Sequence, residues 1–234
     1  MIKHPLIAPL LIGLLTLLLG SCNNPSKKKY PVYGIDVSHH QGPIDWDTIE
    51  AQGIFFAYLK ATEGVDHKDT RFEEYWQTVR GRSFKIGAYH FFSFCKEGAL
   101  QAQNYIESVK LEPGDLPPVV DLEYAGNCKN AFDTKKLIQE ITIYLELITK
   151  HYNVEPVIYT TNRFYKEVVY KHFKNQNIWI RNTYFNPSFS DRKRWIFWQY
   201  RVGPLPGISG DVDLNVFNGS LEKLESYCIK EPSK

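Results

Sequence analysis

The sequence predicts an α/β protein whose strands close into an irregular (β/α) barrel. Short apolar runs alternate with segments of helical periodicity, which is the pattern of parallel strands joined by helices. Eight strand candidates fit a closed barrel, although a small one. After Phe173 the helical periodicity ends, so the last strands are expected to be joined by loops. An open doubly wound sheet is the alternative, but the segment 38–42 after the first strand lacks the glycine-rich phosphate-binding fingerprint.

The expected strands are five to eight residues long, and several are continuously apolar, as strands buried on both faces tend to be. In chain order they are Tyr33–Val37, Phe55–Lys60, Lys85–Phe92, Pro118–Leu122, Pro156–Thr160, Asn177–Arg181, Trp195–Tyr200 and Val212–Val216. Between them, amphipathic spacing predicts helices over Asp45–Gln52, Asp69–Gly81, Gly98–Val109, Thr134–Tyr152 and, more weakly, Arg163–His172.

The first 22 residues are expected to be a lipoprotein signal peptide. Lys3 precedes an apolar run that extends from residue 5 to residue 20. The run ends in Leu-Gly-Ser-Cys, which resembles a bacterial lipoprotein cleavage box with Cys22 as the lipidated first residue. A generic secretory signal or an uncleaved anchor is the alternative. Residues 23–31 are polar and basic and are predicted to form a flexible tether ahead of a single domain over residues 32–228.

The mature chain is close to electrically neutral. Removing residues 1–22 deletes only Lys3 among the charged residues, so the formal net charge falls from +2 to +1. Such a surface argues against nucleic-acid binding, which needs a concentrated basic field. The remaining length of about 205 residues suits one large domain.

Three cysteines remain after lipidation, and an exported protein can form disulfides. Cys95 and Cys128 each follow an expected strand, so their loops can meet at one end of a barrel. We expect a bridge between them that leaves Cys228 unpaired, and three free buried thiols are the alternative. The chain has no Cys-x-x-Cys or His-x-x-x-His spacing, so neither a metal site nor a cofactor is expected.

Two carboxylates stand two residues apart at the end of the buried strand 118–122. Because residues i and i+2 of a strand point to the same face, Asp121 and Glu123 are expected to share one side. Acids at the end of a buried strand are costly unless they are used. Paired carboxylates are typical of glycoside hydrolysis. The alternative is that Asp121 caps a turn and Glu123 is solvated.

Other acids are expected at the same end of the barrel, where the carboxyl ends of the strands meet. Asp36 ends the first strand, and Asp211 and Asp213 stand at the last one. We expect Asp36, Asp121, Glu123 and Asp213 to converge on one mouth and to raise one another's pKa, which keeps one acid protonated near neutral pH. In the alternative interpretation Asp36 caps the following turn, and Asp211 is interpreted as a turn residue.

Aromatic and polar side chains at the strand ends suit a sugar polymer, because aromatic rings stack on the apolar faces of pyranoses. The aromatic side chains expected to line the mouth are Tyr89, Tyr159, Trp198 and Tyr200. Lys60, His90 and Gln199 are further candidates for substrate binding. Lys60 is interpreted more readily as a counter-ion to the acids, and His90 equally well as a hydrogen-bonded core residue.

These motifs together resemble glycoside hydrolase family 25, the Chalaropsis-type lysozymes. The similar stretches occur in family order from about residue 33 to residue 217, over nearly the whole mature domain. They are Tyr33–Gly42, Ile44–Trp46, Ala57–Gly64, Gly87–Phe92, Pro118–Glu123, Pro156–Thr160, Trp198–Tyr200 and Ile208–Asn215. Each stretch is a weak signal alone, and their number and order make the resemblance specific.

The resemblance implies an irregular TIM-like (β/α)5(β)3 barrel that cleaves the β-1,4 bond between N-acetylmuramic acid and N-acetylglucosamine. It implies that Glu123 is the general acid and that Asp121 orients the 2-acetamido group of the substrate as the nucleophile. Asp36 and Asp213 complete the acid cluster. The loop 124–133 and Cys95 match no common family pattern, so subsite preferences do not carry over.

The chain is therefore expected to be a monomeric muramidase of the cell envelope, with peptidoglycan glycan strands as its partner. Its contact with the membrane is expected through the lipid on Cys22 alone. A non-catalytic glycan-binding lipoprotein and a hydrolase of another aminoglycan are the alternatives. The complete set of four acids argues against a non-catalytic protein.

Overall fold

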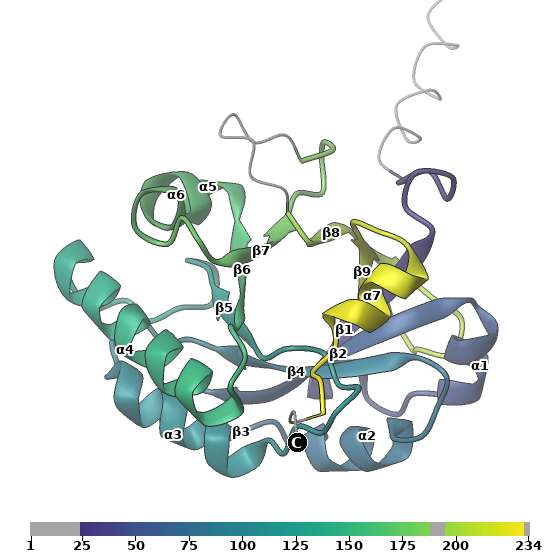
Figure 1. The fold of residues 1–234 in the computed structure, drawn as a ribbon, viewed down its shortest axis with the longest axis horizontal. Helices are drawn as coiled ribbons and strands as arrows, with labels where there is room; N and C mark the ends of the chain where they lie inside the picture. The colour runs from purple at the N-terminus through teal and green to yellow at the C-terminus, as the bar shows by residue number, and fades with distance from the viewer. Residues whose placement is uncertain (1–23, 188–194, 232–234) are drawn as a thin grey trace, which may run out of the picture.

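The computed structural model describes residues 24–187 and 195–231, which form a closed barrel of eight strands (Figure 1). The strands of the ring are β1 (Val32–Val37), β2 (Ile54–Glu63), β4 (Lys85–Phe91), β5 (Val119–Leu122), β6 (Val157–Thr161), β7 (Asn177–Arg181), β8 (Phe197–Pro204) and β9 (Asp211–Phe217). Neighbours from β1 to β8 along the chain are parallel, and β9 closes the ring by pairing antiparallel with both β8 and β1. The two-residue strand β3 (His67–Lys68) extends β2 outside the ring. The predicted irregular barrel is confirmed.

Helices cover the outside of the first part of the barrel, and the described residues between β7 and β9 contain none, as the sequence predicts (Figure 1). They are η1 (His39–Gln41), α1 (Trp46–Ala51), α2 (Phe72–Val79), α3 (Gly98–Ser108), α4 (Thr134–Tyr152), α5 (Asn162–Phe164), the π-helical turn η2 (Tyr165–Val169) and α6 (Tyr170–His172). One further helix, α7 (Leu221–Tyr227), follows the last strand and was not expected. Its N-cap is Ser220, whose side chain accepts a hydrogen bond from the backbone of Lys223.

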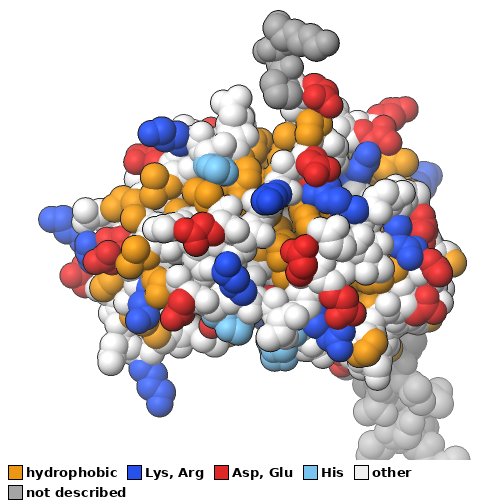
Figure 2. All heavy atoms as spheres, turned by 90° about the horizontal axis from the view of Figure 1, so that it is seen from below, with side chains coloured by type: hydrophobic (Ala, Val, Ile, Leu, Met, Phe, Trp, Pro, Cys, Tyr) orange, Lys and Arg blue, Asp and Glu red, His pale blue; other side chains and the backbone are white. Residues whose placement is uncertain are grey.

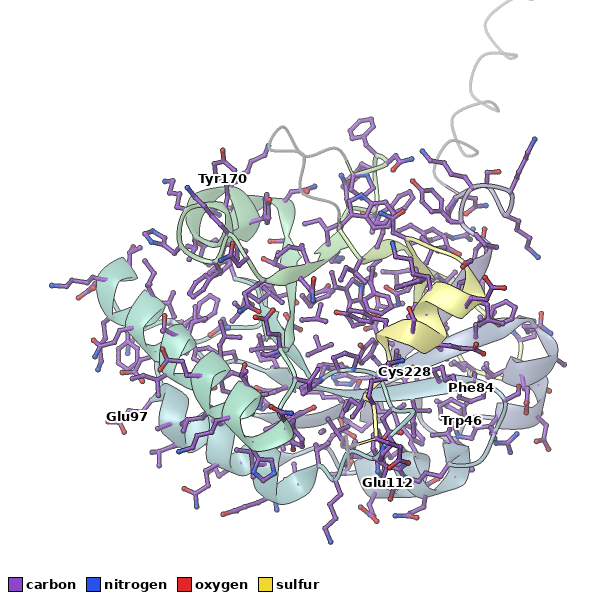
Figure 3. The ribbon with its side chains drawn as sticks, in the orientation of Figure 1. Trp46, Phe84, Glu97, Glu112, Tyr170 and Cys228 are labelled. Atoms are coloured by element: carbon purple, nitrogen blue, oxygen red, sulfur yellow. The ribbon has the colours of Figure 1, made fainter. Side chains whose placement is uncertain are left out.

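The strands alternate between an inner and an outer face, and side chains fill the inside of the ring (Figure 3). Large aromatic rings pack there, and two small residues make room for them: a Cβ on Gly34 would lie 2.4 Å from the ring of Phe56, and one on Gly87 would lie 2.3 Å from Tyr58. The outer face packs against the helices, as where Trp46 meets Phe84 (Figure 3). Because side chains fill the inside of the barrel, a site can form only at the barrel mouth.

The segment 24–31 packs against the barrel, which differs from the flexible tether expected there. Tyr30 is buried, with its ring 5.4 Å from that of Trp195 and 5.9 Å from that of Trp198. The Tyr33 hydroxyl also donates to the carbonyl of Pro25 at 2.5 Å. Burial of an aromatic ring offsets the entropy cost of ordering the segment. The expected signal peptide and Cys22 lie outside the described residues.

The surface seen in Figure 2 carries acidic and basic side chains side by side. This mixture is in keeping with a formal net charge of +2 for the whole chain. Across residues 24–187 and 195–231, no helix has the length and apolar character needed to cross a membrane.

Candidate active site

A cavity of about 460 Å³ opens at the carboxyl ends of the parallel strands. Every strand of the ring contributes to its lining, which includes Asp36, Lys60, Tyr89, Phe91, Asp121, Tyr159, Arg181, Gln199 and Asp213 from strands and Glu123 from just beyond β5. The four acids expected at one mouth are therefore together. They enter from two walls, because Asp121 lies on β5 and Glu123 directly follows that strand, whereas Asp36 and Asp213 are register partners on β1 and β9.

Asp36 is held by two buried amides. Its Oδ2 accepts hydrogen bonds from Asn215 Nδ2 at 2.7 Å and from Gln199 Nε2 at 3.1 Å. Each side-chain amide is oriented in turn by a buried aromatic residue. Trp179 Nε1 donates to Asn215 Oδ1 at 2.9 Å, and the Tyr159 hydroxyl donates to Gln199 Oε1 at 3.1 Å. Burial and the nearby Asp213 raise the pKa of Asp36, and the two amides oppose that shift.

The alternative interpretation of Asp36 as a turn cap is wrong. Ser38 caps the turn η1 instead, with its side chain accepting from the backbone of His40. The same turn brings His40 and Gln41 to the cavity, and neither was singled out as a site residue.

Asp121 is buried and has an oxygen, Oδ1, that finds no hydrogen-bond partner among the described residues. Burial raises its pKa well above the ordinary value, Glu123 and Asp36 raise it further, and the charge of Lys60 opposes them. A buried carboxyl oxygen without a donor is destabilising by itself. It is therefore a ready acceptor for a donor group on a molecule bound in the cavity.

Burial also raises the pKa of Glu123, against the opposing charge of Arg181. It raises the pKa of Asp213 to about 6, again opposed by Arg181. An acid with a raised pKa stays protonated closer to neutral pH, which is what proton donation to a leaving group requires. Arg181 was not among the site residues expected from the sequence, although its place at the end of an expected strand could have indicated it. Asn215 was likewise missed, despite lying in the last matching stretch.

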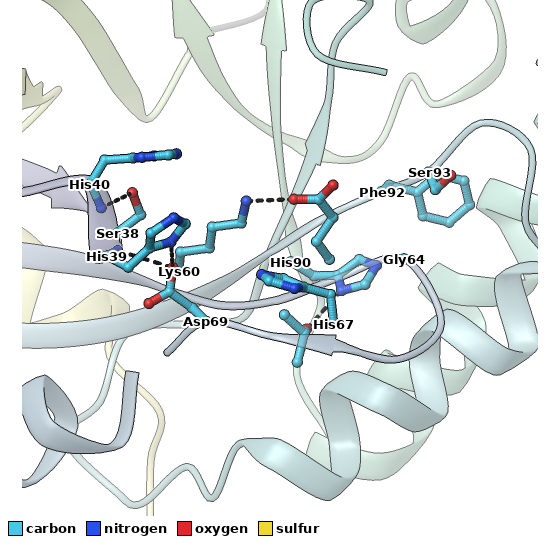
Figure 4. A network of polar contacts seen from close by, with 12 residues as sticks. Ser38, His39, His40, Lys60, Gly64, His67, Asp69, His90, Phe92 and Ser93 are labelled. Atoms are coloured by element: carbon cyan, nitrogen blue, oxygen red, sulfur yellow. Dashed lines mark hydrogen bonds and ion pairs between the residues drawn. The ribbon is translucent and has the colours of Figure 1, made fainter. Parts of the chain in front are cut away.

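Lys60 lines the cavity and also acts as a counter-ion. Its ammonium lies 2.7 Å from the Glu63 carboxylate, the ion pair drawn as a dashed line from Lys60 in Figure 4. It also lies 5.2 Å from the centre of the Phe91 ring. Its charge lowers the pKa of Asp121. Both interpretations of Lys60 from the sequence are compatible with this position.

His90 does not reach the cavity and is a core residue. It is fully buried, with Nδ1 2.7 Å from Thr62 Oγ1 and Nε2 3.2 Å from Gln101 Oε1. Its ring stacks on Tyr144, and burial lowers its pKa to about 3. The expectation of a substrate contact is wrong because alternate residues of β4 face opposite sides, and Tyr89 takes the inner one.

The expectation that Trp198 and Tyr200 line the mouth is wrong for the same reason. On β8 the inward residue is Gln199, which lines the cavity as expected. The Trp198 indole donates to the carbonyl of Asn182 at 2.8 Å on the outer side. The ring of Tyr200 packs against Tyr33, 6.2 Å between centroids. Tyr89 and Tyr159 do line the cavity.

The loops carrying Cys95 and Cys128 meet, as the sequence predicts, but their side chains are free thiols that influence each other's pKa rather than a disulfide. Cys228 is a buried thiol. Within the described parts of the chain, no group of three or more His, Cys, Asp or Glu residues is arranged to hold a metal ion.

Comparison with known proteins gives one family. The model for glycosyl hydrolases family 25 matches residues 35–208. The chain is 34% identical over 210 residues to the uncharacterized protein YegX of Escherichia coli K12, covering 86% of this chain and 76% of YegX. It is 32% identical over 205 residues to lysozyme M1 of Streptomyces globisporus, covering 82% and 70% respectively.

Solved structures agree with this result. A family 25 glycosyl hydrolase from Bacillus anthracis superposes with a TM-score of 0.83 at 36% identity, covering 89% of this chain and 98% of that one. A bacterial lysozyme from Streptomyces coelicolor gives a TM-score of 0.76 at 31% identity, covering 84% and 96%.

Proposed function

This chain belongs to glycosyl hydrolase family 25, and from that membership we propose how the acids at its barrel mouth work. The protein is a glycoside hydrolase of the lysozyme type that cleaves peptidoglycan. The bond that it hydrolyses is the β-1,4 linkage between N-acetylmuramic acid and N-acetylglucosamine. The observation that carries this proposal is the convergence of Asp36, Asp121, Glu123 and Asp213 on one cavity.

Glu123 acts as the general acid. Burial raises its pKa, so the Glu123 carboxyl keeps its proton to higher pH than a solvated glutamate does. In the first step Glu123 donates its proton to the glycosidic oxygen, and the bond from that oxygen to the anomeric carbon breaks. In the second step the resulting carboxylate takes a proton from the attacking water.

Asp121 orients the 2-acetamido group of the substrate. Its buried Oδ1, which has no partner in the described part of the chain, accepts the acetamido N–H, and the acetamido carbonyl oxygen then attacks the anomeric carbon. Because Asp121 and Glu123 rise from the same wall, this assignment needs no carboxylate nucleophile on the opposite side of the sugar. The assisted route retains the β configuration. Proton NMR of freshly formed product tests this: an α-anomer as the first product would instead point to a water activated by Asp36 or Asp213 on the opposite wall.

The central test of the proposal is Glu123→Gln, with Glu146→Gln as its matched control. Glu146 is exposed on α4 and does not line the cavity. Loss of a general acid lowers the rate by about 10²–10⁴-fold. We expect that loss for Glu123→Gln with an unchanged melting temperature, and unchanged activity for Glu146→Gln. Retention of full activity on purified peptidoglycan by Glu123→Gln would contradict the assignment.

The cleaved bond is identified from the new reducing ends. Borohydride reduction of the products and mass spectrometry are expected to show muramitol, not glucosaminitol, at each new end. A parallel digestion of chitin oligomers separates a muramidase from a hydrolase of other aminoglycans. Binding of peptidoglycan without any new reducing ends would favour a non-catalytic glycan-binding protein.

We also propose that the protein is a monomer anchored to the cell envelope through a lipid on Cys22. One chain supplies all eight strands and all four acids of the mouth, which supports the monomer. The segment from residue 24 onwards packs on the barrel, so an anchor at Cys22 would hold the domain close to its membrane. Metabolic labelling with a palmitate analogue tests the anchor: Cys22→Ser is expected to remove the label and release the protein, and persistent labelling would contradict it.

A further inference from the structure

Two thiols meet on the loops that follow neighbouring strands of the barrel. Cys95 lies between β4 and α3, Cys128 lies between β5 and α4, and the two strands pair in parallel. The two thiols are close enough to shift each other's pKa, and the Ser93 hydroxyl lies 3.4 Å from Cys95 Sγ. Both are partly exposed and therefore open to a reagent in solution.

The backbone on either side of each thiol is already fixed. Asn127 Oδ1 accepts from the backbone N–H groups of Phe94 at 2.8 Å and Cys128 at 3.1 Å, which ties one loop to the other. The Gln101 side chain donates to the carbonyls of Ser93 and Lys96, both at 3.0 Å, and so braces the turn around Cys95. The sulfurs are thus brought together by the surrounding hydrogen bonds, without any constraint from a covalent bond.

The third thiol is excluded from this arrangement. Cys228 is 5% exposed and its Sγ donates to the carbonyl of Leu224 within α7. In Figure 3 it lies well away from Glu97, the residue that ends the Cys95 loop. Cys95 and Cys128 therefore have only each other as partners among the described cysteines.

We propose that Cys95 and Cys128 are a disulfide site, which closes when the protein meets a disulfide oxidant in an oxidising compartment. The Cys95 thiolate attacks one sulfur of the oxidant, forms a mixed disulfide and expels one thiolate. Cys128 then loses its proton and attacks Cys95 Sγ, which forms the internal S–S bond and expels the second thiolate. Two electrons pass to the oxidant, and the two protons leave with its two thiols.

The order of attack follows from the surroundings of the two sulfurs. Burial raises the pKa of Cys95, but hydrogen bonds from Cys128 and Ser93 and the charge of Lys96 outweigh it and leave the pKa below its usual value. Burial and the contact with Cys95 raise the pKa of Cys128. The thiolate therefore forms first at Cys95.

The disulfide would link the loop after β4 to the loop after β5, next to the segment that carries Asp121 and Glu123. Asn127 Nδ2 also donates to the carbonyl of Glu123 at 3.1 Å and to that of Phe92 at 2.9 Å. Ala125 and Gly126, between Glu123 and Cys128, line the cavity. The ring closed by the disulfide contains the whole of β5. Formation of the bridge does not depend on the muramidase assignment, so the two proposals fail independently.

Peptide mapping tests the site directly, because trypsin places each of these cysteines in a different peptide: residues 86–96, 111–129 and 224–230. The full chain is equilibrated while folded with excess oxidised glutathione, alkylated in denaturant and digested without reduction. We expect peptide 86–96 linked to 111–129, with 224–230 alkylated. Recovery of alkylated 86–96 and 111–129, or a link to 224–230, would overturn the proposal.

Two variants and a melting experiment complete the test. Cys228→Ser is expected to keep the link, whereas Cys128→Ser is expected to remove it and leave Cys95 alkylated. The oxidised wild-type protein is expected to melt at a higher temperature than the reduced protein, and the Cys95→Ser/Cys128→Ser double variant is expected to melt at one temperature in both buffers. Equal melting of oxidised and reduced wild-type protein would show that the bridge places no constraint on the fold.

Discussion

Replacing Asn215 by alanine is expected to weaken the barrel by removing two buried hydrogen bonds at once. Asn215 is fully buried, donates to the Asp36 carboxyl at 2.7 Å and accepts from Trp179 at 2.9 Å. A hydrogen bond to a charged group contributes about 1.5–3 kcal/mol, and an unsatisfied buried N–H costs roughly 1–3 kcal/mol. The free energy of unfolding is therefore expected to fall by about 3–5 kcal/mol, as measured by urea denaturation.

The loss is expected to depend on pH. Burial gives Asp36 a pKa in the folded state above its unfolded value, so folding takes up a proton and stability falls as the pH rises from the unfolded to the folded pKa. Removing the Asn215 amide raises the folded-state pKa of Asp36 further, so stability falls over a wider range of pH. The destabilisation by Asn215→Ala is therefore expected to be larger near pH 8 than near pH 4, by about 1.4 kcal/mol for each unit of pKa change.

The control for this effect is Asn218→Ala, at a position three residues after Asn215. Asn218 donates to the carbonyl of Trp195 at 2.9 Å, a neutral partner in a half-buried position. Its loss is expected to cost about 1 kcal/mol at every pH. Equal destabilisation by Asn215→Ala near pH 4 and near pH 8 would show that Asn215 does not act by stabilising the ionised Asp36.

Two further predictions concern the acid and the buried histidine. Arg181→Gln removes the charge that lowers the pKa of Glu123, so the alkaline limb of the kcat/KM profile on peptidoglycan is expected to move to higher pH by up to about 1 unit. A limb that stays in place or moves to lower pH would mean that Glu123 is not the group whose protonation sets that limb. His90→Leu leaves the buried side chains of Thr62 and Gln101 without their histidine partner and is expected to lower stability by roughly 2–4 kcal/mol with kcat/KM unchanged. A fall in kcat/KM at unchanged stability would indicate instead that His90 belongs to the substrate site.

Most of the barrel follows from local patterns, because its strands are continuous apolar runs separated by helices of clear periodicity. All eight expected strands are present, and the ends differ by a few residues, as where β2 continues from Lys60 to Glu63. The helix α7 was missed because its seven residues bury only Leu224 and show no long apolar stripe. The antiparallel direction of β9 was not predicted, because hydrophobic runs do not encode strand direction.

The acids of the site could be predicted from the sequence. The alternation of side chains between the two faces of a strand was not used for β4 and β8. Asp121 and Glu123 were placed by the i, i+2 rule, and that same rule separates Gln199 from its neighbours on β8 and Tyr89 from His90. Arg181 was overlooked because a single basic residue at a strand end carries no pattern of its own. Its effect on the pKa of two acids depends on how the ring closes.

The sequence by itself determines the order of the strands, the end of the barrel where acids gather and the family to which the chain belongs. These properties depend on residue spacing and on short motifs, which are local. Only the tertiary structure decides which amides hold Asp36, since Asn215 is 179 positions away from it. It also decides which oxygen of Asp121 lacks a donor among the described residues. Closure of the ring brings these groups together, and burial inside it sets their pKa values, because desolvation depends on every strand that surrounds the mouth.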